Sequence, residues 1–235
     1  MDEPTYGLIG RGRVATHMAR YLELEELPFV TWHREMLAPP DRALDLADII
    51  LLAVSDDAIQ PFLADHPDLR RRPIVHFSGS LVVEGATSLH PLMTFGPELY
   101  DLETYRSIPF AEEKGGPSFR ELFPRLNNPS WPLDPKDKPL YHALCVLAGN
   151  FTTLLWSKAF EDFERRLGLP REALLPFMTQ TCRNTSIAGR TALTGPLARG
   201  DIETVARDLQ ALEGDPYVEV YRAFAKIFDL EEVTT

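Results

Sequence analysis

Cysteine is scarce in this sequence, and long hydrophobic runs are missing. Only two cysteines, Cys145 and Cys182, occur in 235 residues, both in apolar, helix-like surroundings. Such placement predicts buried thiols in a reducing compartment and argues against a disulfide or a metal site. The longest apolar run, Ala47–Val54, is too short to span a bilayer, and the acidic opening of the chain does not have the pattern of a targeting signal. We therefore expect a cytoplasmic protein that binds no metal.

Positive charge is also in short supply. The chain has 24 Lys and Arg against 35 Asp and Glu, a formal net charge of −11. Phosphate backbones and anionic lipid surfaces attract basic faces, so this balance argues against a nucleic-acid or membrane partner. A local basic pocket for a small phosphate ligand remains compatible with it. We expect a small-molecule substrate.

The pattern along the chain changes about halfway. Short apolar runs at 5–9, 27–34, 47–54 and 71–80 alternate with segments of helical periodicity. This alternation predicts an α/β fold with a Rossmann-type, doubly wound and mainly parallel sheet. The proline-rich segment 127–139 is typical of a linker or a last edge strand, and the pattern beyond it is helical. We expect a nucleotide-binding domain at 1–135 and an all-helical domain for substrate binding and dimerisation at 136–235.

A glycine-rich turn follows the first apolar run. Gly10, Gly12 and Ala15 satisfy G-x-G-x-x-A between a predicted strand and a predicted helix. Gly10 permits the sharp turn, Gly12 lets a pyrophosphate approach the backbone, and the helix N-terminus favours its negative charge. The alternative is a tight turn without a ligand. The residues predicted to hold the phosphates are Gly10, Arg11, Gly12, Arg13 and Val14.

The end of the second predicted strand bears on the choice of cofactor. An NAD-preferring site has an acidic residue there, whereas this chain has His33 and Arg34. A guanidinium group matches the oxygens of a 2′-phosphate, and Arg11 could reach the same place from the glycine turn. The alternative is that both arginines are solvated surface charges, and Glu35 lies close by. The pattern favours NADPH over NADH.

Polar residues follow two further predicted strands. Ser55 and Asp56 come after 47–54, and His76 and Ser78 stand at the end of 71–80. Ligands of doubly wound sheets bind at such carboxyl ends. His90 stands before a proline in a third extended segment. A histidine can transfer a proton near neutral pH, although a structural role is the alternative for both histidines.

The helical half contains two more candidate groups. Tyr141, His142 and Asn150 interrupt an otherwise apolar helix, and the last two lie on one broad face. They predict either a cleft or structural hydrogen bonds between helices. Thr194 and Arg199 lie in a turn rich in glycine and proline, where an arginine can clamp a carboxylate or phosphate.

Segments spread along the chain, namely "GLIGRGRVA", "ADIILLAVSDDAI", "VHFSGSL", "SLHPLMTF", "KPLYHALCVLAGNF" and "ALTGPLARGD", occur here in one order. From Tyr6 to Leu212 the chain resembles an uncharacterised family of Rossmann-like oxidoreductases with a C-terminal helical domain of unknown function. That family is similar to pyrroline-5-carboxylate reductase, ketopantoate reductase and the β-hydroxyacid dehydrogenases. The resemblance implies an NADP-binding domain followed by a helical domain that forms a homodimer.

The resemblance also implies roles for individual residues. It places Val54, Ser55 and Asp56 beneath the nicotinamide ribose, and Ser78 and Gly79 in a cofactor-binding loop that faces the substrate. It places His90, Tyr141, His142 and Asn150 in a cleft. Two features depart from the related enzymes: Met93 replaces an expected glutamine, and a lysine–asparagine pair has no clear counterpart. Lys138 precedes the helix, and we expect it to be exposed.

The sequence therefore predicts an NADPH-dependent oxidoreductase that transfers hydride between nicotinamide and a small carbonyl or imine compound. The candidate catalytic residues are His90, Tyr141, His142 and Asn150, and Thr194 and Arg199 are expected to bind the substrate. The alternative is a protein that binds NADP without turnover, as a sensor or interaction module. A structural dimer with a vestigial nucleotide site is a weaker third possibility.

Overall fold

The computed structural model describes residues 3–230. The chain forms two compact units, the first ending at Leu154 and the second beginning at Leu155. The predicted functional division after residue 135 lies earlier in the chain than this boundary. The reason is that the first part of a long helix belongs to the compact unit that contains the sheet. That functional division stays a prediction.

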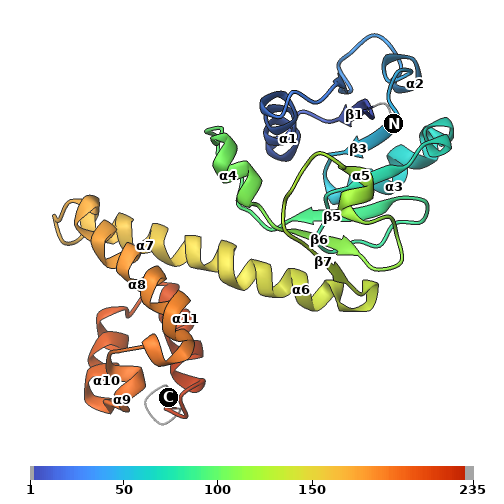
Figure 1. Ribbon diagram of the computed structural model, residues 1–235. Helices are drawn as coiled ribbons and strands as arrows, with labels where there is room; N and C mark the ends of the chain where they lie inside the picture. The colour runs from blue at the N-terminus through green and yellow to red at the C-terminus, as the bar shows by residue number, and fades with distance from the viewer. Residues whose placement is uncertain (1–2, 231–235) are drawn as a thin grey trace. The chain divides into compact units, whose positions relative to one another are not determined.

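The first unit is built on a seven-stranded sheet with the order β2-β1-β3-β4-β5-β6-β7 (Figure 1). The strands β2, β1, β3, β4 and β5 are parallel, β6 runs antiparallel to β5, and β7 is parallel to β6. The prediction of a mainly parallel, doubly wound sheet is confirmed, with β7 as an edge strand. The strands are β1 Tyr6–Ile9, β2 Phe29–Trp32, β3 Ile49–Leu52, β4 Ile74–His76, β5 Thr87–Pro91, β6 Phe110–Glu113 and β7 Ser130–Leu133.

Helices cover both faces of this sheet, which is why its central strands are continuously apolar. One core lies beneath α1, α4 and α5, and the other lies beneath α2 and α3. The helices of this part are α1 Arg13–Leu24, α2 Pro40–Ala43, α3 Asp56–Asp65, η1 Pro67–Arg71, α4 Leu102–Ser107 and α5 Phe119–Leu122.

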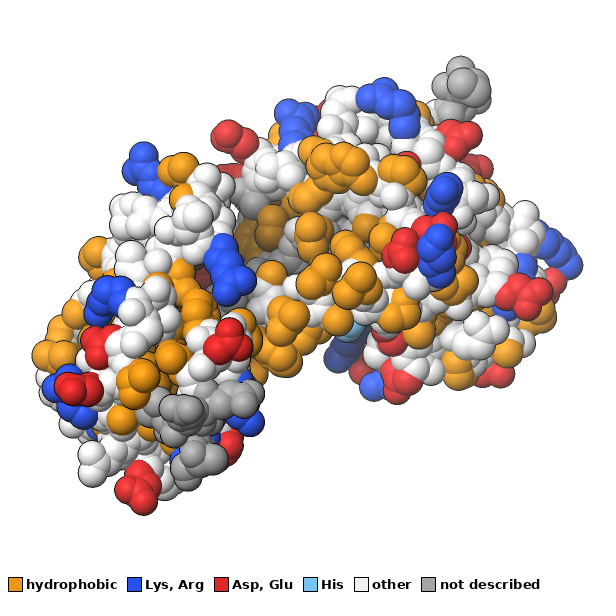
Figure 2. All heavy atoms as spheres, turned by 90° about the horizontal axis from the view of Figure 1, so that it is seen from below, with side chains coloured by type: hydrophobic (Ala, Val, Ile, Leu, Met, Phe, Trp, Pro, Cys, Tyr) orange, Lys and Arg blue, Asp and Glu red, His pale blue; other side chains and the backbone are white. Residues whose placement is uncertain are grey.

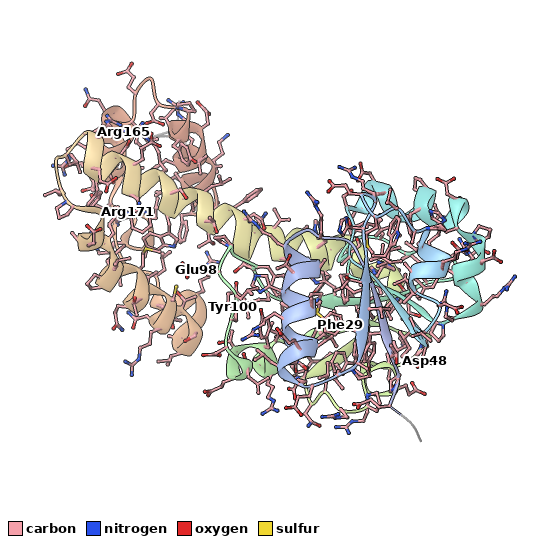
Figure 3. The ribbon with its side chains drawn as sticks, turned by 90° about the horizontal axis from the view of Figure 1, so that it is seen from above. Phe29, Asp48, Glu98, Tyr100, Arg165 and Arg171 are labelled. Carbon is pink, nitrogen blue, oxygen red and sulfur yellow. The ribbon has the colours of Figure 1, made fainter. Side chains whose placement is uncertain are left out.

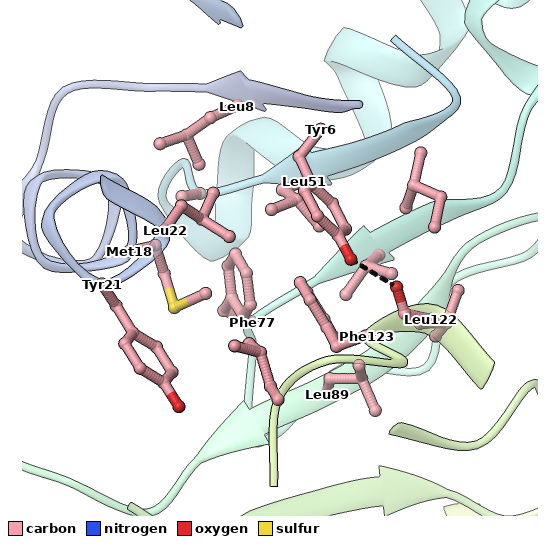
Figure 4. Close-up of a cluster of buried hydrophobic side chains, with 14 of the residues drawn as sticks. Tyr6, Leu8, Met18, Tyr21, Leu22, Leu51, Phe77, Leu89, Leu122 and Phe123 are labelled. Atoms are coloured by element: carbon pink, nitrogen blue, oxygen red, sulfur yellow. Dashed lines mark hydrogen bonds between the residues drawn. The ribbon is translucent and has the colours of Figure 1, made fainter. Parts of the chain in front are cut away.

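Polar groups inside the first core are paired. The hydroxyl of Tyr6 donates to the carbonyl of Leu122 at 3.0 Å (Figure 4). The hydroxyl of Tyr21 donates to Asn128 at 2.6 Å, and the amide of Asn128 donates to the carbonyls of Tyr105 and Ile108. These hydrogen bonds hold α1 and α4 against the segment that precedes β7.

One long helix follows β7. It contains η2 Pro135–Asp137, α6 Lys138–Cys145, a π-helical turn η3 Val146–Phe151 and α7 Thr152–Arg165. By length and composition, Pro135–Arg165 could cross a membrane, although an uninterrupted apolar run is missing from it. It is the one such helix in residues 3–230, and none of its apolar window is buried. A helix covered by other protein surface would meet the same criteria.

Every element of the second unit, as far as residue 230, is a helix, and this confirms the predicted helical C-terminal region. Arg171, labelled in Figure 3, begins η4. Its guanidinium lies 4.9 Å from the centre of the Phe160 ring. Cys182 is exposed and Cys145 is half-buried, so the expectation of two buried thiols is wrong for this chain. The helices are η4 Arg171–Leu174, α8 Leu175–Ala188, η5 Gly189–Ala192, α9 Pro196–Arg199, α10 Ile202–Ala211 and α11 Tyr217–Lys226.

Candidate functional site

A cleft of about 520 Å³ opens at the carboxyl ends of β1 and β3. The chain order reverses between these two strands, and doubly wound sheets bind ligands at such a point. The wall includes apolar residues that the sequence analysis did not single out, among them Ala58 and Phe62. Nine of the twelve residues predicted to bind the cofactor line it, namely Gly10, Arg11, Gly12, Arg13, Val14, His33, Arg34, Val54 and Ser55.

The turn between β1 and α1 forms the floor of the cleft. Gly10 has φ +122°, and a Cβ there would lie 2.2 Å from the carbonyl oxygen of Ala53. A Cβ at Gly12 would meet no atom within 4 Å, so its absence leaves the backbone open to a ligand. Gly12 is the N-cap of α1, and no side chain in the described part of the chain caps that end. The free N–H groups of the first turn therefore suit a pyrophosphate.

Charged residues gather at the β2 side of the cleft. Arg11 forms an ion pair with Glu35, and both side chains are more than half exposed. Arg34 is also exposed, and the Nδ1 atom of His33 is buried without a hydrogen-bond partner in residues 3–230. An exposed ion pair exchanges readily with water and other ions, so Arg11 is able to meet an anionic ligand.

The remaining three predicted cofactor residues form a separate cluster. The hydroxyls of Ser78 and Ser80 both donate to Oδ2 of Asp56, at 2.7 and 2.9 Å. A Cβ at Gly79 would lie 3.0 Å from ring atoms of His90. Gly79 therefore lets the imidazole pack against the loop that follows β4.

His90 and Tyr141 are brought together although they are 51 residues apart. Nδ1 of His90 lies 2.7 Å from the hydroxyl of Tyr141, and the two rings meet edge to face. Burial, with smaller contributions from His142 and Lys138, lowers the pKa of His90 to about 4. Burial, with a smaller contribution from Cys145, raises the pKa of Tyr141 above its usual range. Near neutral pH the pair is an uncharged imidazole and a protonated phenol.

The other predicted site residues are His142, Asn150, Thr194 and Arg199. His142 and Asn150 are exposed on the long helix, and no hydrogen bond joins them to His90 or Tyr141 within residues 3–230. Thr194 and Arg199 belong to the second unit, where both are exposed and Arg199 lies 3.8 Å from Asp201. Their predicted roles stay predictions.

Lys138 differs from its expected place. Its side chain is 2% exposed, and its Nζ atom lies 3.5 Å from Oε2 of Glu113 at the end of β6. The expectation that Lys138 is an exposed residue of the helix start is wrong, because α6 begins directly over the sheet. Local sequence could not show this, since the partner of Lys138 is 25 residues away.

No cluster of three or more potential metal-ligating side chains occurs in residues 3–230.

Comparisons with known proteins agree with this fold. The family model described as "Domain of unknown function (DUF2520)" matches residues 110–227. No curated protein matches the chain. A "putative NADP oxidoreductase" from Bacteroides fragilis superposes with a TM-score of 0.77 at 21% identity, with 98% of each chain covered.

Two further solved structures share the architecture. Pyrroline carboxylate reductase from Plasmodium falciparum with NADP bound gives a TM-score of 0.60 at 13% identity, covering 98% of this chain and 100% of the other. An imine reductase from Streptomyces aurantiacus gives 0.64 at 14% identity, with 98% of each chain covered. At these identities the likeness establishes the fold.

Proposed function

The chain belongs to the DUF2520 family, and we propose that it is an NADPH-dependent oxidoreductase that transfers hydride between nicotinamide and a small carbonyl or imine compound. The observation that carries this proposal is the cleft at the ends of β1 and β3, with its glycine floor and uncapped helix N-terminus. Support also comes from the fold relatives, which include a pyrroline carboxylate reductase with NADP bound and an imine reductase.

The residues of the cleft fit a dinucleotide. Gly12 and the first N–H groups of α1 would hold the pyrophosphate. Arg11 and Arg34 would bind the 2′-phosphate, and Val54, Ser55 and Asp56 would lie beside the nicotinamide ribose. The bound cofactor would supply or accept the hydride.

The Tyr141–His90 pair is the best-supported proton donor. Because the phenol keeps its proton near neutral pH, it can donate that proton to a substrate oxygen or nitrogen. The neutral imidazole of His90 orients the hydroxyl through their 2.7 Å contact. His142, Asn150, Thr194 and Arg199 are candidates for holding the substrate.

The same proposal covers the organisation of the protein. Residues 1–135 would bind the nucleotide, and residues 136–235 would contribute substrate contacts and form a homodimer in the cytoplasm. The apolar side chains exposed along the long helix support an interface there.

Cofactor binding is tested by titrating the purified protein with NADPH, NADP⁺ and NADH and following nucleotide fluorescence. We expect NADPH to bind more tightly than NADH. Arg34→Glu should weaken NADPH binding by about tenfold or more, since a charge-assisted contact with the 2′-phosphate is lost, and should change NADH binding much less. Arg120→Glu, at an exposed arginine on α5, is the matched control and should change neither affinity.

Turnover is tested next, with a panel of small keto acids and cyclic imines and absorbance of NADPH as the readout. Oxidation of NADPH by any member supports an oxidoreductase. Tight binding without turnover across the panel would favour a sensor or interaction module instead. A preference for NADH would contradict the role given to Arg34, and absence of all nucleotide binding would refute both functions.

A further inference from the structure

A second cavity, of about 170 Å³, lies in the first unit beside the end of β5 and the start of β6. Its wall includes Leu92 after β5, Ala111 on β6, Trp131 and Leu133 on β7, and Tyr141 on α6. Because β3, β4 and β5 run parallel to β1, the end of β5 lies at the same edge of the sheet as the larger cleft. The two hollows are distinct, since they share no lining residue within residues 3–230.

The register of the sheet shows how this hollow arises. His90 on β5 pairs with Ala111 on β6, and Ala111 pairs with Trp131 on β7. Paired residues share a face of the sheet, so the small Ala111 lies between two residues with large rings. Its methyl group leaves a gap in the row that a larger side chain would fill. The cavity therefore begins one strand away from His90, at a Cα separation of about 5 Å.

Tyr141 belongs both to the wall of this cavity and to the proposed proton donor. It lines the cavity, and its hydroxyl lies 2.7 Å from Nδ1 of His90. A group held in the cavity therefore packs against the residue whose hydroxyl would give up a proton. No charged side chain in residues 3–230 lines the cavity, and the polar side-chain atoms of its wall belong to Tyr141 and Trp131.

The size and the wall of the cavity define the chemistry of its occupant. An apolar cavity of about 150 Å³ can hold one benzene ring, and this one is of similar volume. A carboxylate or an ammonium group would lose its water there without meeting an opposite charge, which is costly. Trp131 and Leu92 are 61% and 46% exposed, so a bound ring would remove apolar surface of both from water.

We propose that this cavity binds an uncharged apolar ring of the substrate, whose carbonyl or imine group then meets the hydroxyl of Tyr141. The substrates are ring-bearing ketones, aldehydes or imines, and a carboxylate, where one is present, lies outside the cavity. The reaction of such a compound rests on the proposed function, whereas the binding of its ring does not.

Ring binding is tested in the full chain without nucleotide, by fluorine NMR with 4-fluoroacetophenone as the probe. The probe signal should broaden and shift saturably, and acetone, which has no ring, should not displace the probe. Ala111→Leu fills the gap in the row and should weaken probe binding at least tenfold. Ala64→Leu, at an exposed alanine on α3, is the matched control and should leave probe binding unchanged.

A second variant guards against misfolding, since a larger side chain at Ala111 could disturb the sheet. Trp131→Ala removes an exposed wall of the cavity and should also weaken probe binding, with circular dichroism as the check of folding. Normal probe binding in both folded variants would overturn the proposal. A second copy of the chain is the other candidate occupant, so a shift of either variant from dimer to monomer in size-exclusion chromatography would overturn it as well.

Nucleotide and turnover measurements separate this inference from the proposed function. If the protein binds the probe through Ala111 and Trp131 but binds no nucleotide, the proposed function fails and the ring site stands. With NADPH, a phenyl-bearing ketone or imine should have a KM at least tenfold lower than its methyl counterpart, and Ala111→Leu should remove that difference. Oxidation of NADPH by methyl compounds but not by their phenyl counterparts would support the proposed function and overturn the ring site.

Discussion

Gly10 and Gly12 stand two residues apart in the turn between β1 and α1, and each is glycine for a different reason. Gly10 needs a positive φ and has the carbonyl oxygen of Ala53 where its Cβ would be. Gly12 has an ordinary φ of −72° and open space around the missing Cβ. The fold therefore explains the first glycine, whereas the open space at the second is what the proposed pyrophosphate would need.

Alanine substitutions should separate these two reasons. Gly12→Ala should leave thermal unfolding unchanged and weaken NADPH binding by about tenfold or more, because the new methyl group faces the cleft. Gly10→Ala should destabilise the first unit by about 3 kcal/mol through strain and overlap with Ala53. Differential scanning calorimetry and fluorescence titration measure the two effects. If Gly12→Ala bound NADPH normally, the pyrophosphate would have to lie elsewhere.

Single residues also show how far sequence reasoning reaches. The glycine turn between β1 and α1 was predictable because spacing and local backbone geometry carry the information. The burial of Lys138 was not, because it depends on α6 starting over the sheet and on a carboxylate at the end of β6. The contact between His90 and Tyr141 could likewise not be predicted from the local sequence pattern. Both residues could still be singled out as polar residues in apolar segments.

At the scale of elements, the strands and helices around the cleft were predicted well, since alternating apolar runs and helical periods specify a doubly wound sheet. The π-helical turn Val146–Phe151 was not predicted. Such turns are rare and occur inside α-helices, so a helical sequence pattern does not distinguish them. The turn contains Gly149, where a Cβ would come within 3.7 Å of Thr94 in the loop after β5.

In the second unit a charged cluster ties α7 to the start of α11. Nζ of Lys158 donates to Oδ2 of Asp162 at 2.7 Å and to Oδ2 of Asp215, and Arg166 lies near both carboxylates. Hydrogen bonds from Lys158 are the main cause that lowers the pKa of each aspartate. A carboxylate whose pKa is lower in the folded state stabilises the fold above its unfolded pKa.

This cluster predicts a pH dependence. As pH falls from about 5 through the lowered pKa values of Asp162 and Asp215, their contribution to stability should be lost. Lys158→Met should reduce the drop in melting temperature between pH 7 and pH 3, because the aspartates then titrate near their ordinary values. Lys226→Met, at an exposed lysine on α11, is the control. An unchanged pH profile in Lys158→Met would show that the cluster does not stabilise the unit.

At the scale of the whole molecule, the exposed apolar surface is large for a chain with such a small helical core. The buried core of the second unit has four residues, whereas α8 alone exposes Leu175, Phe177 and Ile187. The long helix adds Leu144 and Leu147, both 54% exposed. Apolar side chains are visible in groups between the charged ones in Figure 2. Groups of exposed apolar side chains of this kind mark an interface with protein or membrane.

We expect a second copy of this chain to cover this surface, and light scattering with size-exclusion chromatography tests that expectation. The unaltered protein should elute with twice the monomer mass. Phe177→Glu on α8 and Leu147→Glu on the long helix should each shift it toward the monomer, because a buried unpaired carboxylate is costly. Leu46→Glu, at an exposed leucine after α2, should leave the mass unchanged.

A monomeric unaltered protein that floats with liposomes of phosphatidylcholine would show instead that Pro135–Arg165 meets a membrane. A monomer that does not float would leave the apolar faces without either partner and contradict the homodimer.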